Sequence, residues 1–154
     1  MNNNEKLIDQ FYTAFQNKDY VTMQELYHSD ASFSDPVFTS LNSAQVKAMW
    51  EMLITAGKDL TITFKDIKAD DKSGTCHWEA WYTFSRTGRK VHNSIDASFE
   101  FKDGRILNHR DVFNFWRWAK QALGPAGLVL GWTSAVKNKV RDTARKSLEK
   151  FMKK

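Results

Sequence analysis

The chain has 154 residues, of which 42% are hydrophobic and 14% aromatic, which fits one globular domain and excludes a disordered chain. Its single cysteine excludes an internal disulfide, and no apolar run reaches the roughly 18 residues of a membrane span. The net charge of +5 is uneven, because residues 128–154 carry +6 and residues 1–127 carry −1. With no apolar leader at its start, the chain is expected to be cytoplasmic.

The first part of the chain shows helical spacing. Apolar residues three and four apart predict an amphipathic helix over residues 4–17. Asp19 is placed to cap a second, short helix that carries Met23, Leu26 and Tyr27. The stretch Asn42–Gln45 resembles a capping box and predicts a third helix. Gly57 suits a left-handed exit from that third helix.

From residue 60 to residue 115 the apolar residues alternate with polar ones, which is typical of strands. Turn sequences at residues 73–74, 87–88 and 102–105 divide this part into four strands. On the last strand, Leu107, His109 and Asp111 are expected on one face. Three helices followed by a four-stranded antiparallel meander predict an α+β fold, whose sheet can curl around the helices and enclose a pocket.

The last part of the chain differs in composition. An apolar, glycine-framed link leads to a helical pattern over residues 133–152, with basic residues between its apolar positions. We therefore divide the chain into a domain over residues 1–127 and a basic amphipathic C-terminal helix within residues 128–154. Its apolar stripe, which begins at Trp132, is expected to dock on the protein or on a dimer partner. An anionic membrane surface is the alternative, and no motif indicates nucleic acid.

The stretch Ala31–Phe38 is the most informative motif. A short strand over residues 31–34 ends at Asp35, and Pro36 removes a backbone donor and favours an extended Asp35. This carboxylate is either a turn residue or a group presented at the rim of a pocket. The stretch resembles a motif of the ketosteroid isomerases, in which the acid is the proton-shuttling base. Those enzymes belong to the nuclear transport factor 2-like superfamily, with the SnoaL-like polyketide cyclases and limonene epoxide hydrolase.

The resemblance covers roughly residues 4–123. It implies a cystatin-like cone, with three N-terminal helices packed on a curved antiparallel sheet, to which this chain adds a C-terminal helix. Residues 104–113 look like the terminal strand of limonene epoxide hydrolase, where Asp111 falls on a catalytic carboxylate. SnoaL-like cyclases also place an aspartate base in this region. His109 is expected on the same strand face as Asp111, which suits a proton relay.

The chain departs from these enzymes at other positions. Phe11 and Ala97 stand where ketosteroid isomerases have their two hydrogen-bond donors, so steroid isomerase activity is expected to be absent or very weak. Tyr12 is about 100° further around the helix and is expected to face elsewhere. Asp96 is expected on the polar outer face of its strand. Trp78 and Ala80 stand where limonene epoxide hydrolase has its arginine and other acid.

The candidate catalytic residues are thus Asp35 as a base and Asp111 with His109 as a second acid/base. Burial beside Phe33 and Phe38 is expected to raise the pKa of Asp35. The candidate ligand contacts are aromatic, a pattern equally typical of a core: Phe11, Phe38, Trp50, Trp78, Tyr82, Phe99 and Phe113. One cysteine and four scattered histidines give no zinc pattern, and no metal or other cofactor is expected.

Two classes of function remain open. One is proton-transfer chemistry on a hydrophobic small molecule, such as isomerisation, cyclisation or hydration. The other is a non-catalytic protein that binds a lipophilic ligand or forms a dimeric scaffold. A homodimer through the outer face of the sheet is expected in either case, and a membrane protein anchored by its tail is the third alternative.

Overall fold

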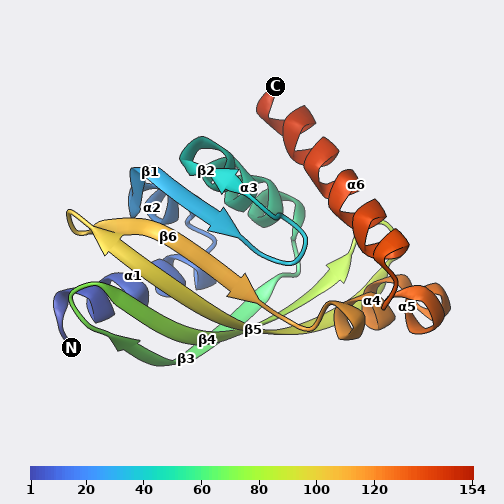
Figure 1. Cartoon of the computed structure of the whole chain (residues 1–154), viewed down its shortest axis with the longest axis horizontal. Coiled ribbons are helices and arrows are strands. Elements are labelled where there is room, and N and C mark those ends of the chain that lie inside the picture. Colours follow the sequence, from blue (N-terminus) through green and yellow to red (C-terminus); the bar gives the residue numbers. More distant parts are fainter.

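The computed structural model describes residues 1–154, which form six helices and six strands (Figure 1). The helices are α1 (Asn3–Gln16), α2 (Tyr20–Glu25), α3 (Ser43–Ala56), α4 (Phe115–Leu123), α5 (Pro125–Leu130) and α6 (Ser134–Met152). The strands are β1 (Tyr27–Ser34), β2 (Leu41–Asn42), β3 (Thr61–Ala69), β4 (Ser73–Phe84), β5 (Arg89–Lys102) and β6 (Arg105–Val112). This is the α+β cone that the sequence predicts, but the glycine-framed stretch predicted as a link before the last helix is itself helical, as α5.

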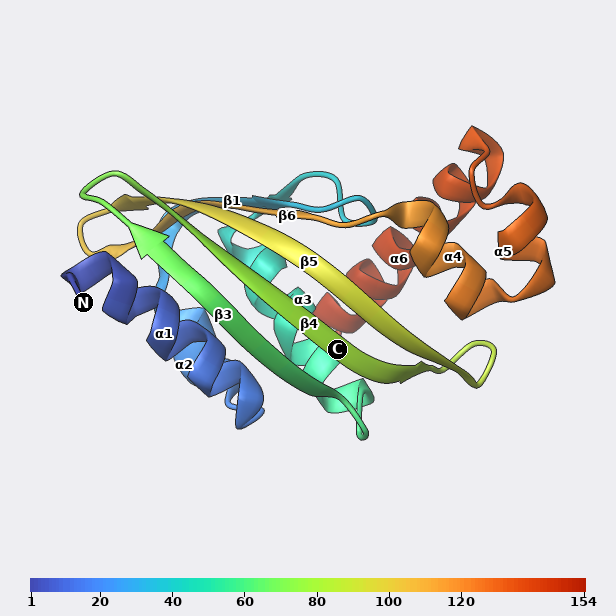
Figure 2. The same cartoon turned by 90° about the horizontal axis from the view of Figure 1, so that it is seen from below.

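All six strands belong to one curved sheet, and α1, α2 and α3 lie on its concave side (Figure 2). The strand order is β2-β1-β6-β5-β4-β3, in which β3 to β6 form the predicted antiparallel meander. β1 adds to the free edge of β6 in parallel, with Phe33 opposite His109. This pairing brings the end of the first strand beside the last one.

The helix caps explain where the first helices begin. Asn2 and Glu5 form a capping box on α1, and Asp19 caps α2 as predicted. The predicted capping box of α3 is confirmed between Asn42 and Gln45. The left-handed exit predicted at Gly57 is wrong, because its φ is −85°. A side chain there would instead come within 2.9 Å of the Leu53 carbonyl oxygen, so close packing explains this glycine.

A bulge sets which side chains of β6 point inward. The β5–β6 register shifts between Glu100 and Phe101, and Phe101 pairs with Ile106. Ile106 is therefore fully buried, and the prediction that Leu107 shares the inner face is wrong. Beyond the bulge the alternation holds, and His109 and Asp111 both face the interior.

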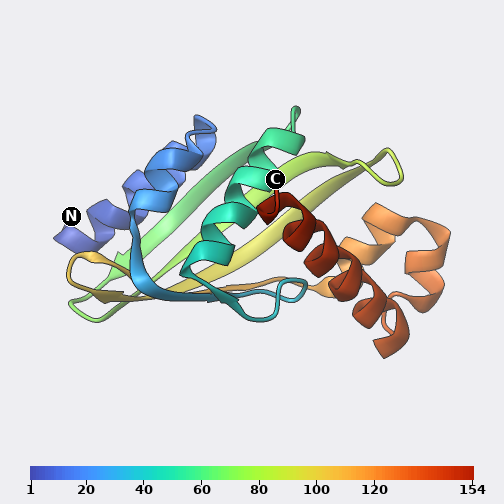
Figure 3. The ribbon, with the colours of Figure 1, turned by 90° about the horizontal axis from the view of Figure 1, so that it is seen from above.

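The three C-terminal helices extend beyond the sheet and then return along the body. Gln121 exchanges two hydrogen bonds with the backbone of His92, which fixes α4 to β5. α6 then runs back beside α3 (Figures 1 and 3). Leu148 of α6 is 2% exposed and joins the main core, so the predicted docking of this helix on its own body is confirmed. Trp132, predicted to start the docked stripe, is 72% exposed and does not join it.

Candidate functional site

A chain of hydrogen bonds crosses the interior of the cone. The Trp50 Nε1 donates to the Tyr27 hydroxyl over 2.9 Å, and this hydroxyl lies 2.8 Å from the Nδ1 of His109. The Nε2 of His109 lies 3.0 Å from the Oδ1 of Asp111, which also accepts from the Trp78 Nε1 over 3.4 Å. Tyr27 and His109 are fully buried, and Asp111 is 3% exposed. We call Tyr27, His109 and Asp111 the inner relay.

The donors and acceptors of the inner relay fit one arrangement of protons. An indole nitrogen can only donate, so the Tyr27 hydroxyl accepts from Trp50 and directs its own proton to the Nδ1 of His109. The other ring nitrogen of His109 then carries a proton and donates it to Asp111. In this arrangement every polar hydrogen of the relay has an acceptor, as burial requires.

Strand geometry explains how the sequence builds the inner relay. Residues two apart on a strand share a face, which places His109 and Asp111 together on β6. In register, Phe33 lies opposite His109 on one side, and Ala97 lies opposite Asp111 on the other. The small Ala97 side chain leaves Asp111 within reach of the Trp78 indole on β4.

Aromatic rings surround His109 closely. The ring centroids of Phe99 and Phe33 lie 4.4 Å and 4.9 Å from that of His109, and Phe11 follows at 5.7 Å. Four of the candidate ligand contacts, Phe11, Trp50, Trp78 and Phe99, are each under 10% exposed and pack in the main core. They wall the inner relay off from water, and their contact with a ligand stays a prediction.

Asp35 lies at the edge of this interior, where β1 ends. Its Oδ1 accepts hydrogen bonds from the backbone N–H groups of Val37 and Phe38, over 2.7 Å and 2.6 Å. The carboxylate therefore does shape a turn, and it is also partly buried. Burial raises the pKa of Asp35 to about 7 against the lowering effect of the Phe38 N–H, and the charge of Asp111 adds to the rise.

The C-terminal helices complete the surroundings of Asp35. Arg141 of α6 donates from Nε to the Pro36 carbonyl over 2.9 Å, and its charge opposes the rise in the Asp35 pKa. Trp118 of α4 donates to the Tyr82 hydroxyl over 2.8 Å. Burial raises the pKa of Tyr82 to about 12, and the charge of Asp35 contributes to this rise. Tyr82, Phe113 and Phe38, the remaining candidate ligand contacts, are thus partly or wholly buried near α4, β1 and the main core.

The sequence alone did not indicate two tyrosines of this interior. Tyr27 is the first residue of β1, and the prediction that it belongs to the second helix is wrong. The prediction that Tyr12 faces elsewhere than Phe11 is wrong, because Tyr12 is 1% exposed, stacks on Phe64 and lies in the same core. Its ring is as close to Phe99 as that of Phe11 (6.3 Å). The Tyr12 hydroxyl is the one buried side-chain oxygen or nitrogen without a hydrogen-bond partner. Burial and the charge of Asp111 raise the pKa of Tyr12.

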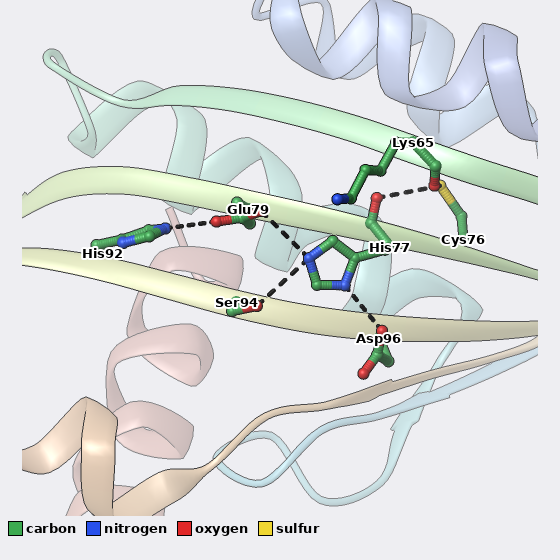
Figure 4. Close-up of polar contacts among 7 residues, drawn as sticks. All are labelled: Lys65, Cys76, His77, Glu79, His92, Ser94 and Asp96. Carbon is green, nitrogen blue, oxygen red and sulfur yellow. Dashed lines mark hydrogen bonds and ion pairs between the residues drawn. The ribbon is translucent and has the colours of Figure 1, made fainter.

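A second group of histidines and carboxylates lies on the outer face of the sheet (Figure 4). His77 contacts Asp96 through Nδ1 at 2.8 Å and Glu79 through Nε2 at 3.3 Å, and the Nε2 of His92 lies 2.7 Å from Glu79. We call these four residues the outer cluster. The Asp96 side chain is 83% exposed, which confirms that it points away from the interior. The hydrogen bond that His77 donates to Asp96 raises the pKa of His77.

Neither cluster provides a metal site, since no group of three or more histidine, cysteine or acidic side chains could hold an ion. Cys76 of β4 is buried in the main core, and its thiol donates to the Lys65 carbonyl over 3.4 Å (Figure 4). Burial raises the pKa of this thiol to about 12, so it is a structural residue and a poor nucleophile. The predicted homodimer through the outer face stays a prediction.

Comparison with known proteins places this interior in context. A SnoaL-like domain matches residues 8–109, which include the relay residues Tyr27 and His109 as well as Asp35. No curated protein sequence matches significantly.

Solved structures match over most of their length. An LEH-like epoxide hydrolase of M. tuberculosis is 20% identical, with a TM-score of 0.62 over 87% of this chain and 95% of that one. A suspected isomerase from Bacillus subtilis is 21% identical, with a TM-score of 0.64 over 80% and 96%. IdmH, a suspected polyketide cyclase from Streptomyces antibioticus, is 22% identical, with a TM-score of 0.62 over 81% and 97%. At these identities the likeness shows the fold.

Proposed function

The chain belongs to the SnoaL-like domain family, and from this membership we propose that it is an enzyme that transfers protons on a hydrophobic small molecule. Isomerisation, cyclisation and hydration are the reaction classes that fit. One feature carries the proposal: Asp35 lies at the edge of an interior that holds the inner relay, where burial raises its pKa to about 7. A carboxylate with such a pKa changes its charge near neutral pH, as a general base must.

Asp35 is the group that would take the proton from the substrate. Both of its backbone hydrogen bonds go to Oδ1, which orients the carboxylate and leaves Oδ2 without a partner. Its raised pKa makes it a stronger base than an ordinary aspartate. The apolar side chains of Val37, Phe113 and Tyr82, which lie between the core and α4, suit a hydrophobic substrate.

Asp111 would be the second acid/base, held in place by the rest of the inner relay. His109 and Trp78 both donate to its Oδ1, so a proton returned to Asp111 would be placed on Oδ2. The negative charge of Asp111 also helps to raise the pKa of Asp35. Asp111 therefore favours the neutral form of Asp35.

Tyr12 would supply a hydrogen bond to a substrate oxygen. Its buried hydroxyl has no partner, although burying an unpaired hydroxyl costs folding free energy. A bound carbonyl or enolate oxygen would satisfy this donor. Tyr12 would in this way compensate for Phe11 and Ala97, which cannot donate from their side chains.

A non-catalytic, ligand-binding protein is the second candidate. The observation that favours it is the absence of a side-chain hydrogen-bond donor at Phe11 and Ala97, the two positions where ketosteroid isomerases have their donors. In that case Asp35 would bind a polar group of the ligand and no proton would be transferred.

Exchange of carbon-bound hydrogen for deuterium separates the two candidates. We would incubate the protein in heavy water with flat unsaturated ketones, among them a β,γ-unsaturated 3-ketosteroid, and follow exchange by NMR. An enzyme should accelerate exchange on at least one ketone, and Asp35→Asn should slow it by about 10²–10⁴-fold. Steroid isomerisation itself should be absent or very weak.

Asp96→Asn is the matched control, because it changes an exposed carboxylate on the outer face and should leave the rate unchanged. Exchange that persists in Asp35→Asn would contradict the proposal. A ketone that raises the unfolding temperature without any exchange would support the ligand-binding alternative.

A further inference from the structure

We propose that α5 and the two tryptophans beside it form a docking surface for an anionic lipid bilayer. Five large apolar side chains are exposed here, and we call them the α5 patch: Trp116 (40%), Leu128 (55%), Val129 (63%), Leu130 (49%) and Trp132 (72%). A run of this size on a short segment is unusual for a protein surface and indicates a binding site. The proposal does not depend on the catalytic role of Asp35.

The backbone of α5 turns these side chains outward. Gly127 and Gly131 are four residues apart and face α4, so closely that a Cβ on Gly127 would lie 1.9 Å from the Ala119 carbonyl oxygen. A Cβ on Gly131 would meet the Ala119 side chain at 2.8 Å. Because glycines occupy the inner side of α5, the side chains of Leu128, Val129 and Leu130 cannot pack on the body and point to solvent instead.

Both tryptophans of the α5 patch have their polar atom satisfied inside the protein. The Trp116 Nε1 donates to the Leu128 carbonyl over 3.2 Å, and the Trp132 Nε1 donates to the Val129 carbonyl over 2.9 Å. These bonds hold both rings on α5. They also allow the rings to enter an apolar medium without leaving a donor unpaired, which would otherwise be costly.

The positive charge near the α5 patch indicates that its partner is anionic. Residues 112–140 contain no acidic residue and four basic ones: Arg117, Lys120, Lys137 and Lys139. The Lys120 Nζ lies 4.1 Å above the Trp116 ring, directly beside the apolar surface. Exposed apolar side chains with a basic border match the interface of a membrane that carries negative headgroups.

The position of α5 leaves it free for an external partner. It lies at the end of the molecule, beyond the sheet and away from the three N-terminal helices (Figures 1 and 2). The stripe of α6 cannot cover it, because Leu148 and Val140 already pack against the body. None of the helices combines the length and the apolar character needed to cross a bilayer, so the contact would be confined to its surface.

Co-sedimentation with vesicles tests the proposal on the full chain. The wild-type protein should pellet with vesicles of phosphatidylcholine and phosphatidylglycerol, and much less with phosphatidylcholine alone. Raised salt should weaken the binding, because the basic border acts through charge. Val129→Asp should lower the vesicle affinity by about tenfold or more, the ratio that corresponds to roughly 1.4 kcal/mol.

Val21→Asp is the matched control, since Val21 is similarly exposed (52%) but lies on α2. It should bind vesicles like the wild type, and circular dichroism should show both variants folded. Wild-type protein that stays in solution with anionic vesicles would overturn the proposal. So would an equal loss in both variants. A change of oligomeric state in Val129→Asp, with vesicle binding unaltered, would overturn it and identify the α5 patch as a contact between copies of the chain.

Discussion

The two faces of one sheet carry the same residue types in two different environments. The inner relay joins His109 to Asp111 where both are almost without solvent, and the outer cluster joins His77 to Glu79 and Asp96 at the surface. The inner relay comes from β1 and β6, and the outer cluster comes from β4 and β5. Alternate residues of a strand point to opposite faces, so Trp78 of β4 donates to Asp111 on the inner face while His77 and Glu79 on either side of it point outward. Histidine and carboxylate neighbours are therefore no indication of a site by themselves.

The difference between the two lies in solvent. Around the outer cluster, water screens the charges and can replace any hydrogen bond that is lost. Around the inner relay, aromatic rings replace water, so each polar group depends on its protein partners. The loss of any one partner would therefore lower the free energy of unfolding. A group of polar residues kept in a core under this condition indicates a function.

The largest effect is expected from removing one partner in each network. Asp111→Ala leaves the N–H groups of His109 and Trp78 unpaired in the core, and should lower the free energy of unfolding by about 3–5 kcal/mol. Glu79→Ala on the outer face should leave the free energy of unfolding close to the wild-type value. Urea unfolding of the two variants checks this. Similar losses of unfolding free energy in both variants would show that burial does not make the inner relay more important for stability than the outer cluster.

The next effect concerns pH. The raised pKa of Asp35 means that the folded state keeps its proton up to about pH 7, whereas the unfolded chain loses it near 3.8. Its contribution to stability is therefore complete below pH 4 and is lost as the pH rises to 7, by at most about 1.4 kcal/mol per pH unit. Asp35→Asn should remove this slope while Oδ1 still accepts from Val37 and Phe38. Urea titrations from pH 4 to pH 8 would measure the difference, and parallel curves would disprove the raised pKa.

A smaller effect is expected at Tyr12. Tyr12→Phe removes the unpaired hydroxyl, so the fold should become more stable by about 1 kcal/mol. Any turnover that uses this donor should fall in the same variant. Thermal unfolding should show the gain in stability, and the deuterium-exchange assay should show the loss of turnover. A destabilised Tyr12→Phe would mean that the hydroxyl already has a partner in solution.

The smallest effect should come from His77. Its pKa is raised by Asp96, so its contribution to stability is present below pH 6.5 and is lost as the pH rises through the folded value. The Asp96 side chain is exposed and that of His77 is partly exposed, so solvent screens the pair, and the change should be slight and should shrink further in high salt. His77→Gln should flatten the profile in this range. This range begins at pH 6.5, near the upper end of the one that Asp35 governs, so profiles of His77→Gln and Asp35→Asn recorded together distinguish the two faces.

Much of the fold could be predicted from the sequence because its signals are local. The capping box at Asn42, the cap at Asp19 and the alternation through β4 and β5 each depend on residues close in the chain. The same alternation placed His109 and Asp111 together and Asp96 outside. Asp35 became a candidate through the resemblance to ketosteroid isomerases, because residue spacing alone cannot distinguish a catalytic aspartate from one that shapes a turn.

The remaining features depend on long-range contacts. Tyr27 joins the inner relay only because β1 pairs with β6, and no pattern near Tyr27 announces that pairing. Arg141 reaches Pro36 from 105 residues away. The bulge that turns Leu107 away from the core adds a single residue, which an alternating pattern cannot show. An aromatic residue that carries a hydroxyl within a buried stretch is the one signal that could have indicated Tyr27 and Tyr12.

The parallel pairing of β1 with β6 has a consequence for the order of folding. Phe33 and His109 are neighbours in space but lie far apart in the chain. Closing so long a loop costs conformational entropy, and this slows the pairing of the two strands. The hairpins of β3 to β6 need only short loops, so they are expected to form first on the ribosome or in refolding. The inner relay would then be completed in the last kinetic step, when β1 joins the sheet and brings Tyr27 to His109. Pulsed hydrogen exchange during refolding should accordingly protect the β4 and β5 amides before those of β1.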